Sequence, residues 1–175
     1  MGSPSHHYAL QAADTQAVHR HVCQMVDELS AQRGLPGEID VHSAANMVSQ
    51  VSYSNKDMLQ AGMIVAGWDA KHGGQVYAIP LGGTLLQVPL AMGGSGSNYV
   101  YAWADSHFRE NMSFEEAEEF VTKAVMYAIA RDGSSGGVVR LCSVSAAGVK
   151  RHHVKQTENG FIKGLDEITE PVAQQ

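Results

Sequence analysis

Two short runs of glycine, serine and aspartate contain the residues of this chain best suited to chemistry. Residues 131–137 read Arg-Asp-Gly-Ser-Ser-Gly-Gly, and residues 93–97 read Gly-Gly-Ser-Gly-Ser. Such runs place small hydrogen-bonding side chains and accessible backbone where another polar group must approach closely. The first run also fits an ordinary helix C-cap followed by a loop. The presence of a second run at another junction between elements favours a site formed by both.

Other kinds of site are possible for these residues and need their own signals. Residues 93–97 precede an expected helix and so suit a phosphate cradle, but they lack the lysine of a P-loop and the spacing of a dinucleotide fingerprint. A nucleophilic role for Ser95, Ser134 or Ser135 would require a nearby base, and no Gly-x-Ser-x-Gly elbow with a histidine partner is evident. The nine histidines do not converge with acidic residues, so no metal site and no cofactor is expected.

The composition excludes several classes of protein. With 175 residues, 44% of them hydrophobic, the chain is long enough for one domain with a substantial core. A net charge of −6 argues against a nucleic-acid partner. No apolar stretch reaches the length of a membrane span, and no signal peptide opens the sequence. Cys23 and Cys142 lack metal-type spacing, which favours reduced, packed thiols in a cytosolic or nuclear protein.

The elements that must position these residues follow from the hydrophobic periods. Helices are predicted from Asp14 to a Gly-Leu-Pro-Gly stop at residues 34–37, and from about Ser43 to residue 54. An apolar run at residues 61–68 predicts a strand buried on both faces, followed by returning strands at 75–79 and 85–92 in an antiparallel meander. Helices follow at residues 98–108 and 113–131, the second opened by a Ser113–Glu116 capping box. Strands at 138–144 and 149–154 form a final hairpin. Residues 1–8 read as an alternative start or a remnant, and no element is predicted there.

This order is a helix pair, a meander, a second helix pair and a hairpin. Two separated groups of strands with two separated helix pairs indicate two packed sheets between layers of helices.

Seven stretches of the chain together resemble one known family. They are Ala-Ala-Asp-Thr-Gln-Ala at residues 12–17, Ala-Gly-Met-Ile-Val-Ala-Gly-Trp-Asp at 61–69, Gly-Gln-Val-Tyr at 74–77, the runs at 93–97 and 131–137, Phe-Arg-Glu-Asn-Met-Ser at 108–113, and Ala-Ala-Gly-Val at 146–149. In their order along the chain they resemble a beta-type subunit of the proteasome core particle, most closely the caspase-like, post-acidic class.

The resemblance implies an α+β fold, the four-layer αββα sandwich of N-terminal-nucleophile hydrolases, incomplete here at its N-terminus. It divides the chain into a leader or remnant at residues 1–11 outside the family, a proteasome beta-type domain at residues 12–154 lacking its first strands, and a polar tail at 155–175.

The resemblance also implies a chemistry, which is peptide-bond hydrolysis by an N-terminal threonine whose own α-amino group helps to accept the proton. By position in the matched motifs, Asp132 stands behind that threonine, Ser135 hydrogen-bonds near the α-amino group, and Ser95 donates to the same cluster and holds the catalytic water. The backbone of Gly94, Gly96 and Gly136 would form the turns of the site, and Ala12 and Ala13 would contribute to substrate binding.

The family's nucleophilic threonine, its aspartate and its lysine lie ahead of the matched residues, and Leu10 stands where the family has an oxyanion-hole glycine. We therefore expect Asp132, Ser135 and Ser95 to be supporting residues only, and the chain as given to be inactive.

The expected function is that of a beta subunit in ATP- and ubiquitin-dependent proteolysis, in the cytoplasm and nucleus. Its partners would be alpha- and beta-type subunits in stacked seven-membered rings, and unfolded polypeptides would be its substrates. The alternatives are a non-catalytic structural or regulatory subunit and, more distantly, an unrelated small-molecule-binding domain.

Overall fold

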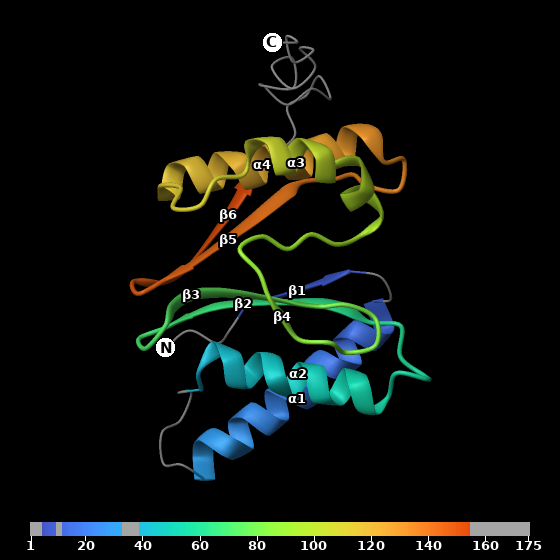
Figure 1. Ribbon diagram of the computed structural model, residues 1–175, viewed down its shortest axis with the longest axis vertical. Helices are drawn as coiled ribbons and strands as arrows, with labels where there is room; N and C mark the ends of the chain where they lie inside the picture. The colour runs from blue at the N-terminus through green and yellow to red at the C-terminus, as the bar shows by residue number, and fades with distance from the viewer. Residues whose placement is uncertain (1–4, 10–11, 33–38, 155–175) are drawn as a thin grey trace. The chain divides into compact units, whose positions relative to one another are not determined.

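The computed structural model describes residues 5–9, 12–32 and 39–154 (Figure 1). The chain divides into two compact units. Of the described residues, one unit comprises those up to Gly94 with Ser143–Lys150, and the other comprises Ser95–Cys142 with residues 151–154. None of the helices in the described part of the chain has an apolar stretch sufficient to cross a bilayer.

The first unit is built on a four-stranded antiparallel sheet in the order β1-β2-β3-β4. Its strands are β1 (Ser5–Ala9), β2 (Gly62–Asp69), β3 (Gly73–Ile79) and β4 (Leu86–Gln87). β1 was not predicted, because the sequence of residues 1–8 has no clear apolar alternation. Pairing with β2, in which Ser5 lies opposite Ala66 and Ala9 opposite Gly62, forms this strand.

The meander of β2, β3 and β4 was predicted, but its last strand is much shorter than expected. We predicted a strand over residues 85–92, whereas β4 contains only Leu86 and Gln87. One further ladder hydrogen bond runs from the Val88 N–H to the Val76 carbonyl, at 3.0 Å. Pro89 then ends the ladder because it has no N–H to donate.

β2 is not buried equally on its two faces. Met63, Val65 and Gly67 are buried, whereas the alternate residues Gly62, Ile64 and Ala66 are half-buried. The prediction of a strand buried on both faces is confirmed for one face, and the other face is half-buried. The small residues at 62 and 66 make the run read as continuously apolar without requiring full burial of both faces.

Two helices cover one face of this sheet (Figure 1). α1 (Ala12–Gln32) begins two residues before Asp14, which we had predicted to be its N-cap. Asp14 lies instead in the first turn, where its Oδ2 accepts the Gln60 N–H at 3.1 Å. The run at residues 34–37, predicted to end this helix, lies outside the described residues.

α2 (Val41–Ser54) also starts two residues earlier than predicted, because Asp40 is its N-cap. The Asp40 Oδ1 accepts the Ser43 N–H at 2.7 Å, and its Oδ2 accepts the Ser43 hydroxyl at 2.8 Å. This pattern satisfies backbone donors of the first turn, which have no partner within the helix.

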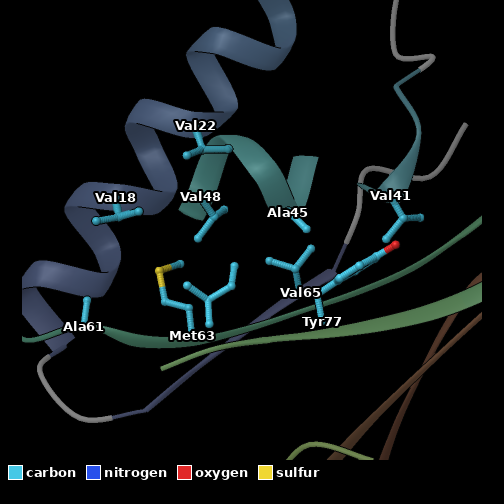
Figure 2. Close-up of a cluster of buried hydrophobic side chains, with 10 residues drawn as sticks. Val18, Val22, Val41, Ala45, Val48, Ala61, Met63, Val65 and Tyr77 are labelled. Carbon is cyan, nitrogen blue, oxygen red and sulfur yellow. The ribbon is translucent and has the colours of Figure 1, made fainter. Parts of the chain in front are cut away.

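The core of the first unit lies between these helices and the sheet. Figure 2 shows the side chains of both helices pointing toward those of the sheet. The cluster contains Val18 and Val22 of α1, Val41, Ala45 and Val48 of α2, and Ala61, Met63, Val65, Tyr77 and Ile79 of the sheet and its approach. Burial of these apolar side chains is the main force that holds α1 and α2 on β2 and β3.

A single carboxylate ties the β2–β3 turn to the start of α2. The Asp69 Oδ1 accepts the N–H groups of Lys71 (3.0 Å) and His72 (2.7 Å), and its Oδ2 accepts the Val41 N–H (3.3 Å) and the Gln75 amide (2.5 Å). Burial alone would raise the pKa of Asp69, but these hydrogen bonds, led by that from His72, outweigh it and lower the pKa. The carboxylate is therefore held in its charged form.

The helical part of the second unit differs from the prediction at its start. The helix expected at residues 98–108 is instead a 3₁₀ helix, η1 (Ser95–Tyr99), followed by the short α3 (Tyr101–His107). Gly96, Ser97 and Asn98 have low helix propensity, which accounts for the tighter, shorter first segment.

α4 (Phe114–Arg131) confirms the predicted capping box. The Ser113 hydroxyl accepts the Glu116 N–H at 3.2 Å, and the Glu116 Oε2 accepts the Ser113 N–H at 2.8 Å. These reciprocal bonds fix the first turn of the helix whose other end carries Asp132.

The predicted hairpin is present as β5 (Val139–Ser145) and β6 (Gly148–Val154), which form a separate two-stranded sheet. Met126 and Ile129 of α4 pack on Val139 and Leu141 of β5. Cys23 and Cys142 are half-buried and form no disulfide. Burial, followed by the nearby Asp27 charge, raises the pKa of the Cys23 thiol.

Candidate active site

The site begins where α4 ends. Asp132 is the C-cap residue, and its N–H donates to the Ala128 carbonyl at 2.8 Å while its backbone turns to an extended conformation. The next residues fold back on it, since the Ser135 N–H donates to the Asp132 carbonyl at 3.0 Å and the Ser134 N–H donates to Asp132 Oδ1 at 3.1 Å. Aspartate favours such turns because its carboxylate accepts backbone donors two residues on. The turn itself therefore orients the carboxylate.

Two serine hydroxyls converge on the other oxygen of this carboxylate. The Ser95 Oγ, at the start of η1, donates to Asp132 Oδ2 at 2.7 Å, and the Ser135 Oγ donates to the same atom at 2.5 Å. Ser95 is thus brought to residues that lie 37 positions later in the chain. All three residues belong to the second unit, and the structure places them in one hydrogen-bonded cluster, as the two sequence runs suggested.

The cluster keeps Asp132 ionised. Its side chain is buried, with a relative exposure of 8% for the residue. The hydrogen bond from Ser135, then that from Ser95, then the N–H of Ser134 hold the pKa of Asp132 below its usual range, against a smaller opposing effect of burial. A buried carboxylate with three donors is a stable anion at neutral pH.

The direction of these hydrogen bonds decides what the site can do. A serine hydroxyl has one hydrogen and two lone pairs, and here each hydrogen is directed to Asp132 Oδ2. Ser95 and Ser135 therefore offer oxygen lone pairs to any further neighbour, backed by a negative charge. These two oxygens can accept hydrogen bonds from an ammonium group, an amine or a water molecule.

The same geometry weighs against the other kinds of site. Among the described residues, Ser95 and Ser135 have an ionised carboxylate rather than a histidine as their partner, so neither has the base that a nucleophilic serine needs. The charge of Asp132 beside Ser95 would repel a phosphate at residues 93–97. No group of three or more histidine, cysteine, aspartate or glutamate side chains suited to a metal ion occurs in the described part of the chain.

The three glycines predicted to form the turns differ in what they contribute. Gly94 has a φ of 95°, a conformation that favours glycine. Gly96 is buried against α4, where a Cβ would lie 2.9 Å from that of Ala128. Gly136 has no heavy atom within 4 Å of a Cβ position, so the structure gives no steric reason for glycine there. The neighbouring Gly137, with a φ of 87°, has such a reason and was missed.

The two predicted substrate-binding residues lie in the other unit. Ala12 and Ala13 form the exposed first turn of α1 and belong to the first unit. Their role in substrate binding stays a prediction.

Two contributors to the cluster escaped the sequence analysis. The Ser134 N–H bonds Asp132 through the backbone, and the Asp-Gly-Ser order at residues 132–134 is a turn signal from which it could have been inferred. Ala128 supplies the carbonyl that accepts the Asp132 N–H and the methyl group that faces Gly96. Only the approach of η1 to α4 reveals that second contact.

Comparison with known proteins gives one consistent result. A family model described as "Proteasome subunit" matches residues 8–144, a range that contains the whole cluster. The chain is 48% identical over 141 residues to proteasome subunit beta type-6 of Arabidopsis thaliana, with 81% of this chain and 60% of that protein covered.

Two fungal relatives agree. The probable proteasome subunit beta type-1 of Schizosaccharomyces pombe is 49% identical over 140 residues (80% of this chain, 61% of that protein). Proteasome subunit beta type-1 of Saccharomyces cerevisiae is 46% identical over 140 residues (80% and 64%). The chain thus spans 60 to 64% of the length of these relatives.

Proposed function

The chain belongs to the proteasome subunit family and is similar to its beta-type members, and on this premise we propose that it acts as a catalytic-type beta subunit of a core particle. The complete subunit would be a threonine-type endopeptidase of the caspase-like class, cleaving unfolded polypeptides after acidic or small hydrophobic residues. Its partners would be alpha- and beta-type subunits in stacked seven-membered rings, working in ubiquitin-dependent proteolysis in the cytoplasm and nucleus.

The observation that carries this proposal is the orientation of the cluster. An N-terminal-nucleophile enzyme uses its terminal α-amino group as the proton acceptor, and that group needs hydrogen-bond acceptors to hold it beside the nucleophile. The lone pairs of Ser95 and Ser135, with the Asp132 charge behind them, supply acceptors of this kind. The same acceptors suit the water molecule that must later hydrolyse the acyl-enzyme.

In this mechanism the residues of the cluster position and polarise without forming bonds to the substrate. Asp132 fixes the rotation of both hydroxyls, so their lone pairs are presented before the α-amino group arrives. Such preorganisation lowers the barrier because no dipole has to reorient as the amine takes up and releases a proton. The nucleophilic oxygen itself would belong to the terminal threonine of the complete subunit.

The test uses the complete subunit in the assembled particle. We expect Asp132→Ala to lower hydrolysis of a fluorogenic peptide with an acidic residue before the scissile bond by about 100-fold, because misplacing a catalytic group by about 1 Å costs this much. Native mass spectrometry would show that the particle still assembles. Asp57→Asn, an exposed carboxylate after α2, is the matched control with unchanged activity. Near-normal hydrolysis by an assembled Asp132→Ala particle would contradict the proposal.

N-terminal sequencing of the subunit from the assembled particle separates this proposal from its alternative. A terminal threonine is expected for a catalytic subunit. A different terminal residue in an assembled particle would identify a non-catalytic structural or regulatory subunit.

A further inference from the structure

Gly96 and Ala128 meet at the contact between η1 and α4. Gly96 is buried, and a Cβ at its position would lie 2.9 Å from the Ala128 Cβ, 3.1 Å from the Ser135 Oγ and 3.4 Å from Asp132 Oδ2. Carbon atoms in contact normally lie about 3.5–4.0 Å apart, so a side chain at position 96 would have to push the two segments apart by at least about 0.6 Å.

This contact is linked directly to the cluster. Ser95 adjoins Gly96 in η1, and the Asp132 N–H is bonded to the Ala128 carbonyl at 2.8 Å. The Ser95–Asp132 hydrogen bond is already 2.7 Å long, near the optimum for a hydroxyl donor. A separation of η1 from α4 would therefore lengthen this bond beyond the useful range. If the Ser135 hydroxyl moved aside instead, the second hydrogen bond of the cluster would be lost.

We propose that Gly96 and the methyl group of Ala128 form a steric pair that positions Ser95 and Ser135 on Asp132. The inference rests on the proposed peptidase function and names two positioning residues for it. Neither residue contacts the reacting atoms. The pair acts by setting the distance between two segments that are remote in sequence.

The decisive property of a steric pair is that the second partner can compensate for the first. Gly96→Ala adds the clashing methyl group, and Ala128→Gly removes the methyl group it meets. In the double variant the closest contact left is that with the Ser135 Oγ at 3.1 Å, a few tenths of an ångström short of a relaxed distance. Ala128→Gly alone weakens α4 by roughly 1 kcal/mol through helix propensity. Ala130→Gly, at an exposed position of the same helix, carries a similar penalty without opening the contact.

The experiment measures kcat, KM and structure for the assembled particle. For Gly96→Ala we expect kcat to fall between about 10- and 100-fold with KM within about twofold, because the cluster is misplaced and the substrate-binding surface is not. Gly96→Ala/Ala128→Gly should recover kcat to within about fivefold of the wild type, and Gly96→Ala/Ala130→Gly should not recover it. Gly74→Ala, where a Cβ meets nothing within 4 Å, is the matched glycine control in β3.

Cryo-electron microscopy of the Gly96→Ala particle gives a readout independent of activity. The Ser95 Oγ to Asp132 Oδ2 separation should lengthen from 2.7 Å to about 3.3 Å or more in this variant and return toward 2.7 Å in the compensated double variant. An unchanged separation in Gly96→Ala, or a failure of Ala128→Gly to restore it, would overturn the steric pair even if Asp132 proves essential. If Gly96→Ala blocks assembly, the pair requires that Ala128→Gly restore assembly and that Ala130→Gly not do so. Full activity of Asp132→Ala would instead refute the proposed function and leave this structural test to decide the pair.

Discussion

Asp132 gathers two hydroxyl hydrogens at one carboxylate oxygen, and this fixes the chemical character of the surface around it. An aspartate that accepted backbone donors alone would leave the two serines free to rotate. Here Ser95 and Ser135 are both donors to Oδ2, while the Ser134 N–H holds Oδ1. The hydroxyl oxygens of Ser95 and Ser135 therefore present lone pairs to the surroundings. These lone pairs accept hydrogen bonds from an amine or ammonium group and do not suit an anion.

At this scale the two serines should contribute unequally to the pKa of Asp132. The hydrogen bond from Ser135 is the strongest influence that lowers this pKa, and that from Ser95 is the next. We expect Ser135→Ala to raise the pKa of Asp132 toward its ordinary value of about 3.9, and Ser95→Ala to raise it less. Carboxyl ¹³C NMR of the purified protein over a pH titration measures both. A larger rise in Ser95→Ala than in Ser135→Ala would contradict this order.

Polar contacts at the ends of the elements fix where they begin, while the apolar core holds them together. Asp40 caps α2 by accepting two hydrogen bonds from Ser43, and Asp69 joins the first backbone N–H of α2 to the β2–β3 turn. Ser113 and Glu116 hold the start of α4. Each contact satisfies backbone groups that the helix or turn cannot satisfy itself, and this fixes where the element begins.

The contribution of Asp69 to stability should depend on pH. Because its folded-state pKa is lowered, the stabilisation is fully present above the unfolded-state pKa of about 3.9 and is lost as the pH falls through the lower folded-state value. Asp69→Asn should flatten the fall in unfolding free energy below about pH 5, and should cost about 1–3 kcal/mol at neutral pH through weakened hydrogen bonds. Urea unfolding between pH 3 and pH 7 tests this. The exposed Asp57→Asn should leave both quantities unchanged, and an identical pH dependence in Asp69→Asn would refute the assignment.

Two adjacent glycines in the β3–β4 connection offer a matched comparison of strain and contact. Both have positive φ, 97° at Gly82 and 82° at Gly83, but only Gly83 packs on α2, where a Cβ would lie 2.5 Å from the Tyr53 nitrogen. Gly82→Ala should cost about 1–2 kcal/mol for its backbone conformation alone. Gly83→Ala should cost about 1–3 kcal/mol more, since the clash with backbone adds overpacking. Equal unfolding free energies for the two variants in urea would show that the contact with α2 is not maintained in solution.

At the scale of the whole molecule, the chain comprises two units that differ in their cores. The first surrounds a ten-residue buried cluster between two helices and a four-stranded sheet. Among the described residues, the second has fewer buried apolar side chains, which are Val100, Ala104, Phe120, Met126, Val139 and Leu141. Trp103 stacks on Phe120 at 5.3 Å between ring centroids. The cluster around Asp132 thus belongs to the unit with the smaller apolar core. Family membership shows the N-terminal-nucleophile hydrolase fold that the sequence predicted.

Amide hydrogen exchange should show different protection in the two units. Amides of β2 and β3 should be the most protected, because the larger core must open before they exchange. Val65→Ala, which removes two buried carbons and about 2 kcal/mol, should raise exchange in β2 and β3 more than in α4. Met126→Ala should show the opposite distribution. Equal rises across both units in either variant would show that they open together.

Local signals explain what could be predicted. The capping box at Ser113, the small residues around Asp132 and the hairpin at residues 139–154 depend on neighbours within a few positions, so their patterns are readable in the chain itself. The predictions that were wrong concern residues whose structure depends on a partner distant in the sequence. Asp14 has the sequence signature of an N-cap, but its carboxylate accepts the Gln60 N–H instead. Only two of residues 85–92 form a strand, because Pro89 and the limited pairing with β3 end it early.

The sequence by itself determined the chemical identity of the candidate site: an aspartate and two serines in two glycine-rich runs, and a resemblance that the comparisons with beta-type proteasome subunits support. Only the tertiary structure decided that Ser95 reaches Asp132 across 37 residues, that the methyl group of Ala128 requires glycine at position 96, and that residues 5–9 pair with β2. The physical reason is that residue type is encoded locally, whereas close approach and strand register depend on which segments pack together.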